Sequence, residues 1–133
     1  MQIVDANIVL RYLLSDHEEL SAKAEEIIDN NSIHLPIEVL CEVVYVLEKV
    51  YKAARNDVAE ELTGLISNLE VTLPSREAVL VGLRNYGTEN LDFVDCVLAG
   101  YAEVENVEVH TFDKKLRKLL DEKTPEELNV DKS

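Results

Sequence analysis

The chain is poor in basic residues, cysteine, glycine and proline. Its 133 residues hold 13 Lys and Arg against 27 Asp and Glu, which gives a formal net charge of −14. This balance argues against a general nucleic-acid binder, which usually shows a basic footprint. With only four glycines and three prolines, no long flexible linker divides the chain. The two cysteines, Cys41 and Cys96, form no CxxC pair, which favours buried free thiols over a disulfide or a zinc site.

The sequence also lacks the long apolar run of a membrane span and the basic leader of a secretory signal. We therefore expect a cytoplasmic protein with no membrane partner. A length of 133 residues fits one domain, and the hydrophobic fraction of 47% is ordinary for a globular protein. We expect this domain over residues 1–122 and an acidic, frayed tail over residues 123–133.

Short apolar strands alternate with amphipathic helices along the sequence. Strands are expected at residues 2–5, 33–35, 70–73 and 107–111. Helices are expected over residues 7–14, 15–29, 37–54, 56–69, 74–86, 92–105 and 113–122. Ser15 or Asp16 is the expected cap of the second helix, and Asn56 is the expected cap of the fourth. Gly87 is the expected stop of the fifth helix. This alternation predicts an α/β fold, with a short central parallel sheet covered by helices on both faces in three α/β/α layers.

Four carboxylates mark the edges of these elements. Asp5, Asp95 and Asp113 stand where a strand or loop leads into a helix, and Glu42 lies within the expected helix 37–54. Strand ends and the helix starts that follow them lie along one edge of a parallel sheet, so the four acids are expected to converge. Two carboxylates 4 Å apart repel by about 1 kcal/mol in water and about 4 kcal/mol at an effective dielectric near 20. Such a cluster needs protons or a divalent cation, which points to a metal-dependent enzyme.

Each acid also has a purely structural explanation. Asp5 and Asp113 suit N-caps that follow a strand. Asp92 and Asp95 have the spacing of a capping box, so that Asp92 either caps its helix or joins the site. Glu42 shares its helical face with other polar residues, which fits a solvated surface. The order of the acids and their common edge together favour a shared site.

Four strings carry a resemblance to a known family. They are IVDANIVLRYLL, LCEVVYVL, LDFVDCVLAGYA and VHTFDKKL. In this order and spacing they resemble the PIN domain family, particularly the VapC-type toxins of prokaryotic toxin–antitoxin pairs, and the resemblance reaches to about Leu120. It implies a PIN-like nuclease domain over residues 1–122 and a ribonuclease that uses Mg²⁺ or Mn²⁺. It also implies RNA as substrate, a cognate antitoxin as partner, and a homodimer.

The resemblance also implies residue roles. The catalytic acids would be Asp5, Glu42, Asp95 and Asp113, which would hold the metal together with Asp92, while Asn7 and Thr111 match supporting polar positions. Ala6 departs from the family, in which Thr or Ser usually stands at this position. Oxygen ligands suit Mg²⁺ or Mn²⁺, whereas zinc favours His and Cys, and the three histidines show no zinc-binding spacing.

A basic run directly follows Asp113. It consists of Lys114, Lys115, Arg117 and Lys118, which are candidates for contacts with the RNA backbone. Cations near the end of a helix also interact favourably with its dipole, which explains the run equally well.

The sequence also bears on functions other than that of a nuclease. A non-catalytic binding module with the same fold would use the acidic surface to hold a basic protein partner, as the net charge and Ala6 suggest. A phospho-signalling receiver needs an acceptor Asp after a central strand, but Pro36 and Pro74 follow the second and third strands. A haloacid-dehalogenase-type phosphatase needs a second Asp where Asn7 stands, and the glycines form no phosphate-binding loop.

Overall fold

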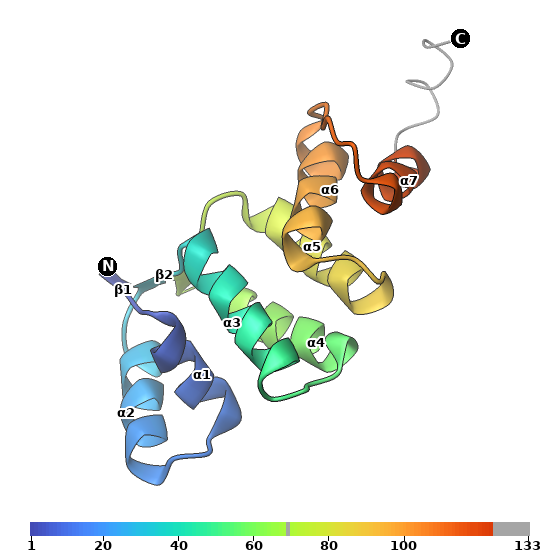
Figure 1. Cartoon of the computed structure of the whole chain (residues 1–133). Coiled ribbons are helices and arrows are strands. Elements are labelled where there is room, and N and C mark those ends of the chain that lie inside the picture. The colour runs from blue at the N-terminus through green and yellow to red at the C-terminus, as the bar shows by residue number, and fades with distance from the viewer. Residues whose placement is uncertain (69, 124–133) are drawn as a thin grey trace, which may run out of the picture. The chain divides into compact units, whose positions relative to one another are not determined.

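The computed structural model describes residues 1–68 and 70–123, and within these residues it contains three short strands and seven helices (Figure 1). In chain order they are β1 (Gln2–Ile3), α1 (Ala6–Leu14), α2 (Glu18–Asp29), β2 (Ile33–His34), α3 (Ile37–Lys49), α4 (Arg55–Ile66), β3 (Val71–Thr72), α5 (Arg76–Thr88), α6 (Phe93–Glu105) and α7 (Lys114–Lys123). The contacts divide the chain into two compact units, residues 1–76 and the residues from 77 onward.

The first unit contains a parallel sheet with strand order β1-β2-β3. Gln2 lies opposite Ile33, and Ile33 in turn lies opposite Val71. Parallel neighbours cannot be joined by a tight turn, and here α1 and α2 connect β1 to β2 while α3 and α4 connect β2 to β3. The parallel α/β sheet expected from the sequence is confirmed, although each strand is shorter than its apolar string.

Helical spacing of apolar residues builds the core of this unit. Fully buried side chains come from α1, α2, α3, α4 and the strands, and include Val9, Ala24, Ile28, Leu40, Val43, Leu62, Ile66 and Val71. Burying one Val, Leu or Ile side chain contributes about 1.5–3 kcal/mol. Each helix therefore turns its apolar stripe inward, as the sequence pattern predicted.

The junction of α1 and α2 differs from the sequence prediction. Ser15 adopts a left-handed conformation (φ 50°, ψ 34°) and ends α1, with its N–H donating to Arg11 O at 3.1 Å. Asp16 binds the Arg11 guanidinium at 2.8 Å. His17 caps α2 instead, because its Nδ1 accepts from Leu20 N at 3.1 Å. The expected cap at Ser15 or Asp16 was wrong, since both residues serve the end of α1.

The boundary between α3 and α4 also shifts. α3 ends at Lys49 rather than at residue 54, and Lys52 takes a positive φ of 57° in the turn that follows. α4 starts at Arg55, so Asn56 lies inside its first turn and is not the expected cap. Arg55 also pairs with Glu48 at 3.2 Å, which ties the start of α4 to the end of α3.

Arg76 forms hydrogen bonds with three backbone carbonyls near the end of the first unit. Its guanidinium donates to the carbonyl oxygens of Val71 at 2.7 Å and Asn68 at 2.9 Å, and also to that of Ile66. The carbonyls at a helix C-terminus have no partner within the helix. Arg76 therefore satisfies carbonyls at the end of α4 and in β3 with a single side chain.

Close helix packing defines the second unit. A Cβ added at Gly82 of α5 would come within 2.9 Å of the Cα of Val97 in α6, and one at Gly100 would collide with the carbonyl oxygen of Ala78. The two backbones therefore approach closely only because these residues are glycines. Gly87, the expected helix stop, instead lies within α5.

The core of the second unit includes aromatic and thiol side chains. The buried rings of Tyr86 and Phe93 meet edge to face, with centroids 5.9 Å apart. Cys96 is a buried free thiol and Cys41, in the first unit, is a half-buried one, and neither forms a disulfide, as the sequence predicted. α7 packs against α6 through an apolar face of Leu116, Leu119 and Leu120.

The expected strand at residues 107–111 is not formed. Residues 106–113 lie in neither helix nor strand, and the carbonyl oxygen of Val109 accepts from Arg117 Nη2 at 2.9 Å. A strand requires ladder bonds to a neighbour, and this carbonyl bonds to a side chain of the following helix instead. Of the expected tail over residues 123–133, residues 124–133 lie outside the described part of the chain.

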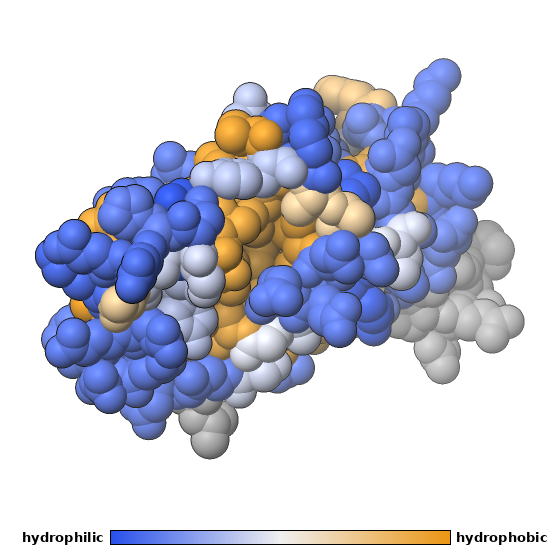
Figure 2. Space-filling view, turned by 90° about the horizontal axis from the view of Figure 1, so that it is seen from below, coloured by the Kyte–Doolittle hydropathy of each residue, from blue (hydrophilic) through white to orange (hydrophobic). Residues whose placement is uncertain are grey.

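Charged and polar residues make up most of one face of the molecule, although apolar residues are visible in the middle of that face (Figure 2). Hydrophilic residues cover most of the face seen in Figure 2, in line with a sequence in which 30% of residues are charged. Among the described residues, no helix has both the length and the apolar character needed to span a bilayer.

Candidate active site

Asp5 connects β1 to α1. It is the N-cap of α1, with its Oδ1 accepting from Ile8 N at 3.1 Å, and its side chain is exposed. The buried Val4 and Ala6 on either side fix the chain at this point, so the carboxylate must face solvent. Asp5 therefore caps a helix, while one of its oxygens makes no hydrogen bond to the described residues. Asn7, the neighbouring polar residue, is also exposed.

Glu42 lies on the exposed face of α3. Its helical neighbours Glu38, Tyr45 and Lys49 are exposed as well, and Tyr45 keeps 63% of its surface in solvent. α3 packs against α1, the helix that Asp5 caps. Burial raises the pKa of the Cys41 thiol in the same helix, and the negative charge of Glu38 raises it further. The solvated face considered from the sequence is thus what the structure shows around Glu42.

Asp92 and Asp95 open α6 but do not form a capping box. Asp92 occupies the N-cap position, yet neither its side chain nor that of Asp95 accepts a hydrogen bond from the described residues. The N-cap geometry of Asp92 (φ −59°, ψ 148°) positions the backbone alone. The capping-box explanation was wrong, and both carboxylates remain unused by the local structure.

Asp113 caps α7. Its Oδ1 accepts from Leu116 N at 2.8 Å, and its own N–H donates to Thr111 Oγ1 at 3.0 Å. The Thr111 hydroxyl thus holds the backbone at the acid, while the carboxylate holds the first turn of the helix. The N-cap predicted from the sequence is confirmed.

The second unit brings three of these acids into electrostatic contact. Partial burial raises the pKa of Asp95, and the negative charges of Asp113 and Asp92 raise it further. A raised carboxyl pKa means that the ionised form is disfavoured, as expected for acids that share one region. Asp113, which lies 18 residues further along the sequence, therefore acts on Asp95. Asp5 and Glu42 belong to the first unit.

Every one of these acids offers only oxygen donors, which suit Mg²⁺ or Mn²⁺ better than zinc. Within residues 1–68 and 70–123, however, no three His, Cys, Asp or Glu side chains stand close enough together to hold a metal ion. The chemistry of the donors and the repulsion felt by Asp95 thus favour a cation, while the described residues contain no ready three-ligand cluster.

The basic run after Asp113 divides over different faces of α7. Arg117 turns back to Val109 O and contacts Asp121 at 3.5 Å. Lys115 and Lys118 line a pocket instead, and Lys114 is exposed outside it. The four cations therefore do not form a single surface, which the sequence alone could not show.

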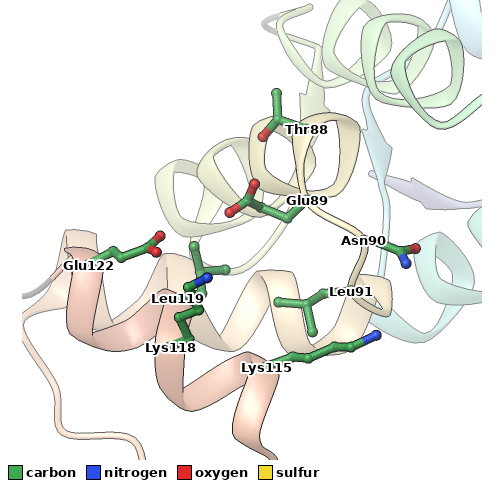
Figure 3. A pocket seen from close by; sticks show the side chains of 8 residues that line it. All are labelled: Thr88, Glu89, Asn90, Leu91, Lys115, Lys118, Leu119 and Glu122. Carbon is green, nitrogen blue, oxygen red and sulfur yellow. The ribbon is translucent and has the colours of Figure 1, made fainter.

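This pocket, which we call the α5–α7 pocket, was missed in the sequence. It is lined by Thr88, Glu89, Asn90, Leu91, Lys115, Lys118, Leu119 and Glu122, and its volume is about 320 Å³ (Figure 3). The only sequence signal was on α7, where residues 115, 118, 119 and 122 follow helical spacing and so share one face. Nothing in the sequence linked that face to residues 88–91.

The chain belongs to the PIN domain family, whose profile matches residues 3–121. Its parallel sheet and flanking helices agree with the α/β/α fold class of that family. The chain is also similar to a VapC ribonuclease of Aquifex aeolicus (strain VF5), with 29% identity over 134 residues that cover 90% of this chain and 92% of the relative. No solved structure matches the chain.

Proposed function

We propose that this protein is a metal-dependent endoribonuclease, the toxin of a toxin–antitoxin pair. The proposal is supported by membership of the PIN domain family and by the similarity to a VapC ribonuclease. The single observation that carries it is at the start of α6, where Asp92 and Asp95 make no capping bond and Asp95 is influenced by Asp113. Acids that local structure does not use are available for chemistry.

The proposed catalytic acids are Asp5, Glu42, Asp95 and Asp113, with Asp92 as a further metal ligand and Asn7 as a supporting residue. Bound Mg²⁺ or Mn²⁺ would polarise the scissile phosphate, activate a water and stabilise the leaving oxygen. Thr111 would act as a positioning residue, because its hydroxyl accepts from the N–H of Asp113 and so fixes the backbone at that acid. The exposed carboxylate of Asp5 leaves an oxygen for a ligand while it caps α1.

RNA is the proposed substrate, and the exposed lysines of α7 are its proposed backbone contacts, together with Arg117. A chain of charge −14 repels RNA overall, so cations close to the acids and the bound metal must offset that repulsion locally. A cognate antitoxin is the proposed protein partner and a homodimer the proposed assembly. The proposal places the protein in the cytoplasm, where its substrate is found.

The direct test is cleavage of a mixed-sequence single-stranded RNA with Mg²⁺, Mn²⁺ or EDTA. We expect cleavage with either metal, none with EDTA, and at least a hundredfold lower rate for Asp5→Asn and Asp95→Asn. Asp57→Asn, an exposed acid in the first turn of α4, is the matched control and should cleave like the wild type. Full activity in Asp5→Asn and Asp95→Asn would reject the assignment of the site.

A second candidate is a non-catalytic module that holds a basic partner through its acidic surface. The net charge of −14 and Ala6, which stands where the family usually has Thr or Ser, favour it. Titration calorimetry with Mn²⁺ separates the two functions. Heat of binding that disappears in Asp95→Asn supports the nuclease, whereas no Mn²⁺ binding and no RNA cleavage by the wild type support the binding module.

A further inference from the structure

We propose that the α5–α7 pocket binds one nucleotide of the RNA substrate, with Lys115 and Lys118 on its phosphate and Asn90 at the edge of its base. This inference rests on the proposed ribonuclease function and adds a substrate-recognition subsite to it. All lining residues belong to the second unit, from the end of α5 and the loop after it to α7 (Figure 3).

The two lysines are available for an anion. Neither Lys115 nor Lys118 forms an ion pair within the described part of the chain, although acids outnumber bases two to one in the sequence. Lys23 and Lys49, by contrast, each contact a glutamate on their own helix. Arg117, between the two pocket lysines, is occupied by Val109 O and Asp121. The pocket therefore contains two cations that no ion pair in the described part of the chain uses.

The remaining walls suit a nucleotide rather than a bare phosphate. Leu91 and Leu119 are almost completely buried and present apolar surface to the pocket. Asn90 is exposed and offers both a donor and an acceptor, as the edge of a base requires. The Thr88 hydroxyl donates back to Arg84 O at 3.2 Å and so can only accept from a ligand. A volume of about 320 Å³ is at the small end of the range for ligand pockets.

The charges in the pocket limit the occupant to a single anion. In Figure 3 Lys115 reaches along Leu91 toward the side of Asn90, and Lys118 reaches between Glu89 and Glu122. The formal charges of the two lysines and the two glutamates sum to zero. The ammonium groups attract one phosphate, whereas the glutamates repel an occupant that carries many carboxylates. RNA carries one charge per nucleotide and supplies a base, whose flat face suits the two leucines and whose polar edge suits Asn90, and this favours RNA over an acidic peptide.

The pocket is also near a proposed catalytic acid. Asp113 caps the helix that carries both lysines. With a rise of about 1.5 Å per residue, Lys115 and Lys118 lie about 3 Å and 7.5 Å along the axis of α7 from Asp113. A nucleotide in the pocket would therefore be next to, and not at, the phosphate whose bond is cleaved beside the acids. The pocket would hold the RNA in register for cleavage.

The test compares two double variants that each remove two positive charges. K115Q/K118Q replaces the two pocket lysines. K23Q/K123Q replaces Lys23 of α2 and Lys123, the last residue of α7, and both of these lysines lie outside the pocket. Binding of a fluorescein-labelled single-stranded RNA octamer is measured by anisotropy in EDTA, on the Asp95→Asn background to prevent cleavage. Circular dichroism checks that every variant is folded.

We expect at least tenfold weaker RNA binding for K115Q/K118Q at 50 mM salt and less than a twofold change for K23Q/K123Q. Loss of the one phosphate contact that the two lysines share should also reduce the slope of log K against log salt by about 0.7, as expected for one neutralised phosphate on a single strand. Asn90→Ala should weaken binding of the octamer without changing this slope. It should have no effect on an octamer without bases, because the amide contacts only the base.

The possible results distinguish failure of the pocket proposal from failure of the proposed ribonuclease function. If the wild type cleaves RNA and K115Q/K118Q binds it as tightly as K23Q/K123Q, the pocket proposal is wrong and the nuclease stands. If the wild type neither binds nor cleaves RNA, both proposals fail. If K115Q/K118Q keeps its RNA affinity but no longer binds a poly-glutamate peptide that the wild type binds, the pocket serves an acidic protein partner and the inference is overturned.

Discussion

Asp113 caps α7 with one carboxylate oxygen, and its negative charge also raises the pKa of Asp95 at the start of α6. The same residue thus stabilises its own helix and destabilises the ionised form of a neighbouring acid. The two effects can be measured separately because Asp95, unlike Asp113, makes no capping bond.

Asp95→Asn should make the metal-free protein more stable at neutral pH while abolishing cleavage. Burial, then Asp113 and Asp92, raise the folded-state pKa of Asp95 above its unfolded value. The contribution of such a group to stability is fully present below the unfolded pKa and is lost as the pH rises through the folded pKa. Thermal unfolding in EDTA should show a higher Tm for the variant at pH 7 and a smaller difference near pH 4. An unchanged Tm difference across that range would contradict the electrostatic origin.

Asp113→Ser and Asp113→Ala should separate the two roles of Asp113. Ser is a good N-cap, so Asp113→Ser should keep the stability of the wild type within about 0.5 kcal/mol and still lose cleavage. Asp113→Ala also loses the bond to Leu116 N and should unfold about 1 kcal/mol more easily. Urea denaturation and RNA cleavage measure the two effects. Equal stability of both variants would show that the cap is unimportant.

Thr111→Val should lower the turnover number about three- to tenfold and leave RNA affinity unchanged. The hydroxyl accepts from Asp113 N at 3.0 Å, and losing one such hydrogen bond costs about 0.5–1.5 kcal/mol. Steady-state kinetics on a labelled RNA give kcat and KM separately. Thr111→Ser keeps the hydroxyl and should restore kcat, whereas a rise in KM alone would argue against a positioning role.

Gly100→Ala should destabilise the protein by about 1–3 kcal/mol, because the new methyl group collides with the carbonyl oxygen of Ala78 where α6 meets α5. Gly64→Ala is the matched control. This glycine is also inside a helix, but its added Cβ meets no described atom within 4 Å apart from the adjoining residues and backbone of its own helix, so higher helix propensity should stabilise the protein by about 0.4–1 kcal/mol. Chemical denaturation of both variants should give changes of opposite sign.

Much of the fold followed from local sequence patterns. The apolar spacing of α3 and α7 and the alternation of strands with helices gave the elements and their parallel sheet, since these patterns depend on residues within one or two turns. The caps at Asp5 and Asp113 were also predictable, because a capping bond spans only three residues. The Asp92–Asp95 pair had similar spacing and makes no such bond, and nothing local distinguishes the two cases.

The sequence by itself determined the order of the seven helices and of the three strands that form within the described residues, and the family to which the chain belongs, because each rests on residue types and their spacing. Only the tertiary structure decided which side chains remain free. Burial of Leu116, Leu119 and Leu120 fixes the rotation of α7, and this rotation sends Arg117 back to Val109 and turns Lys115 and Lys118 into the α5–α7 pocket. Helix rotation depends on packing between segments far apart in the chain, and for that reason no local pattern predicted it.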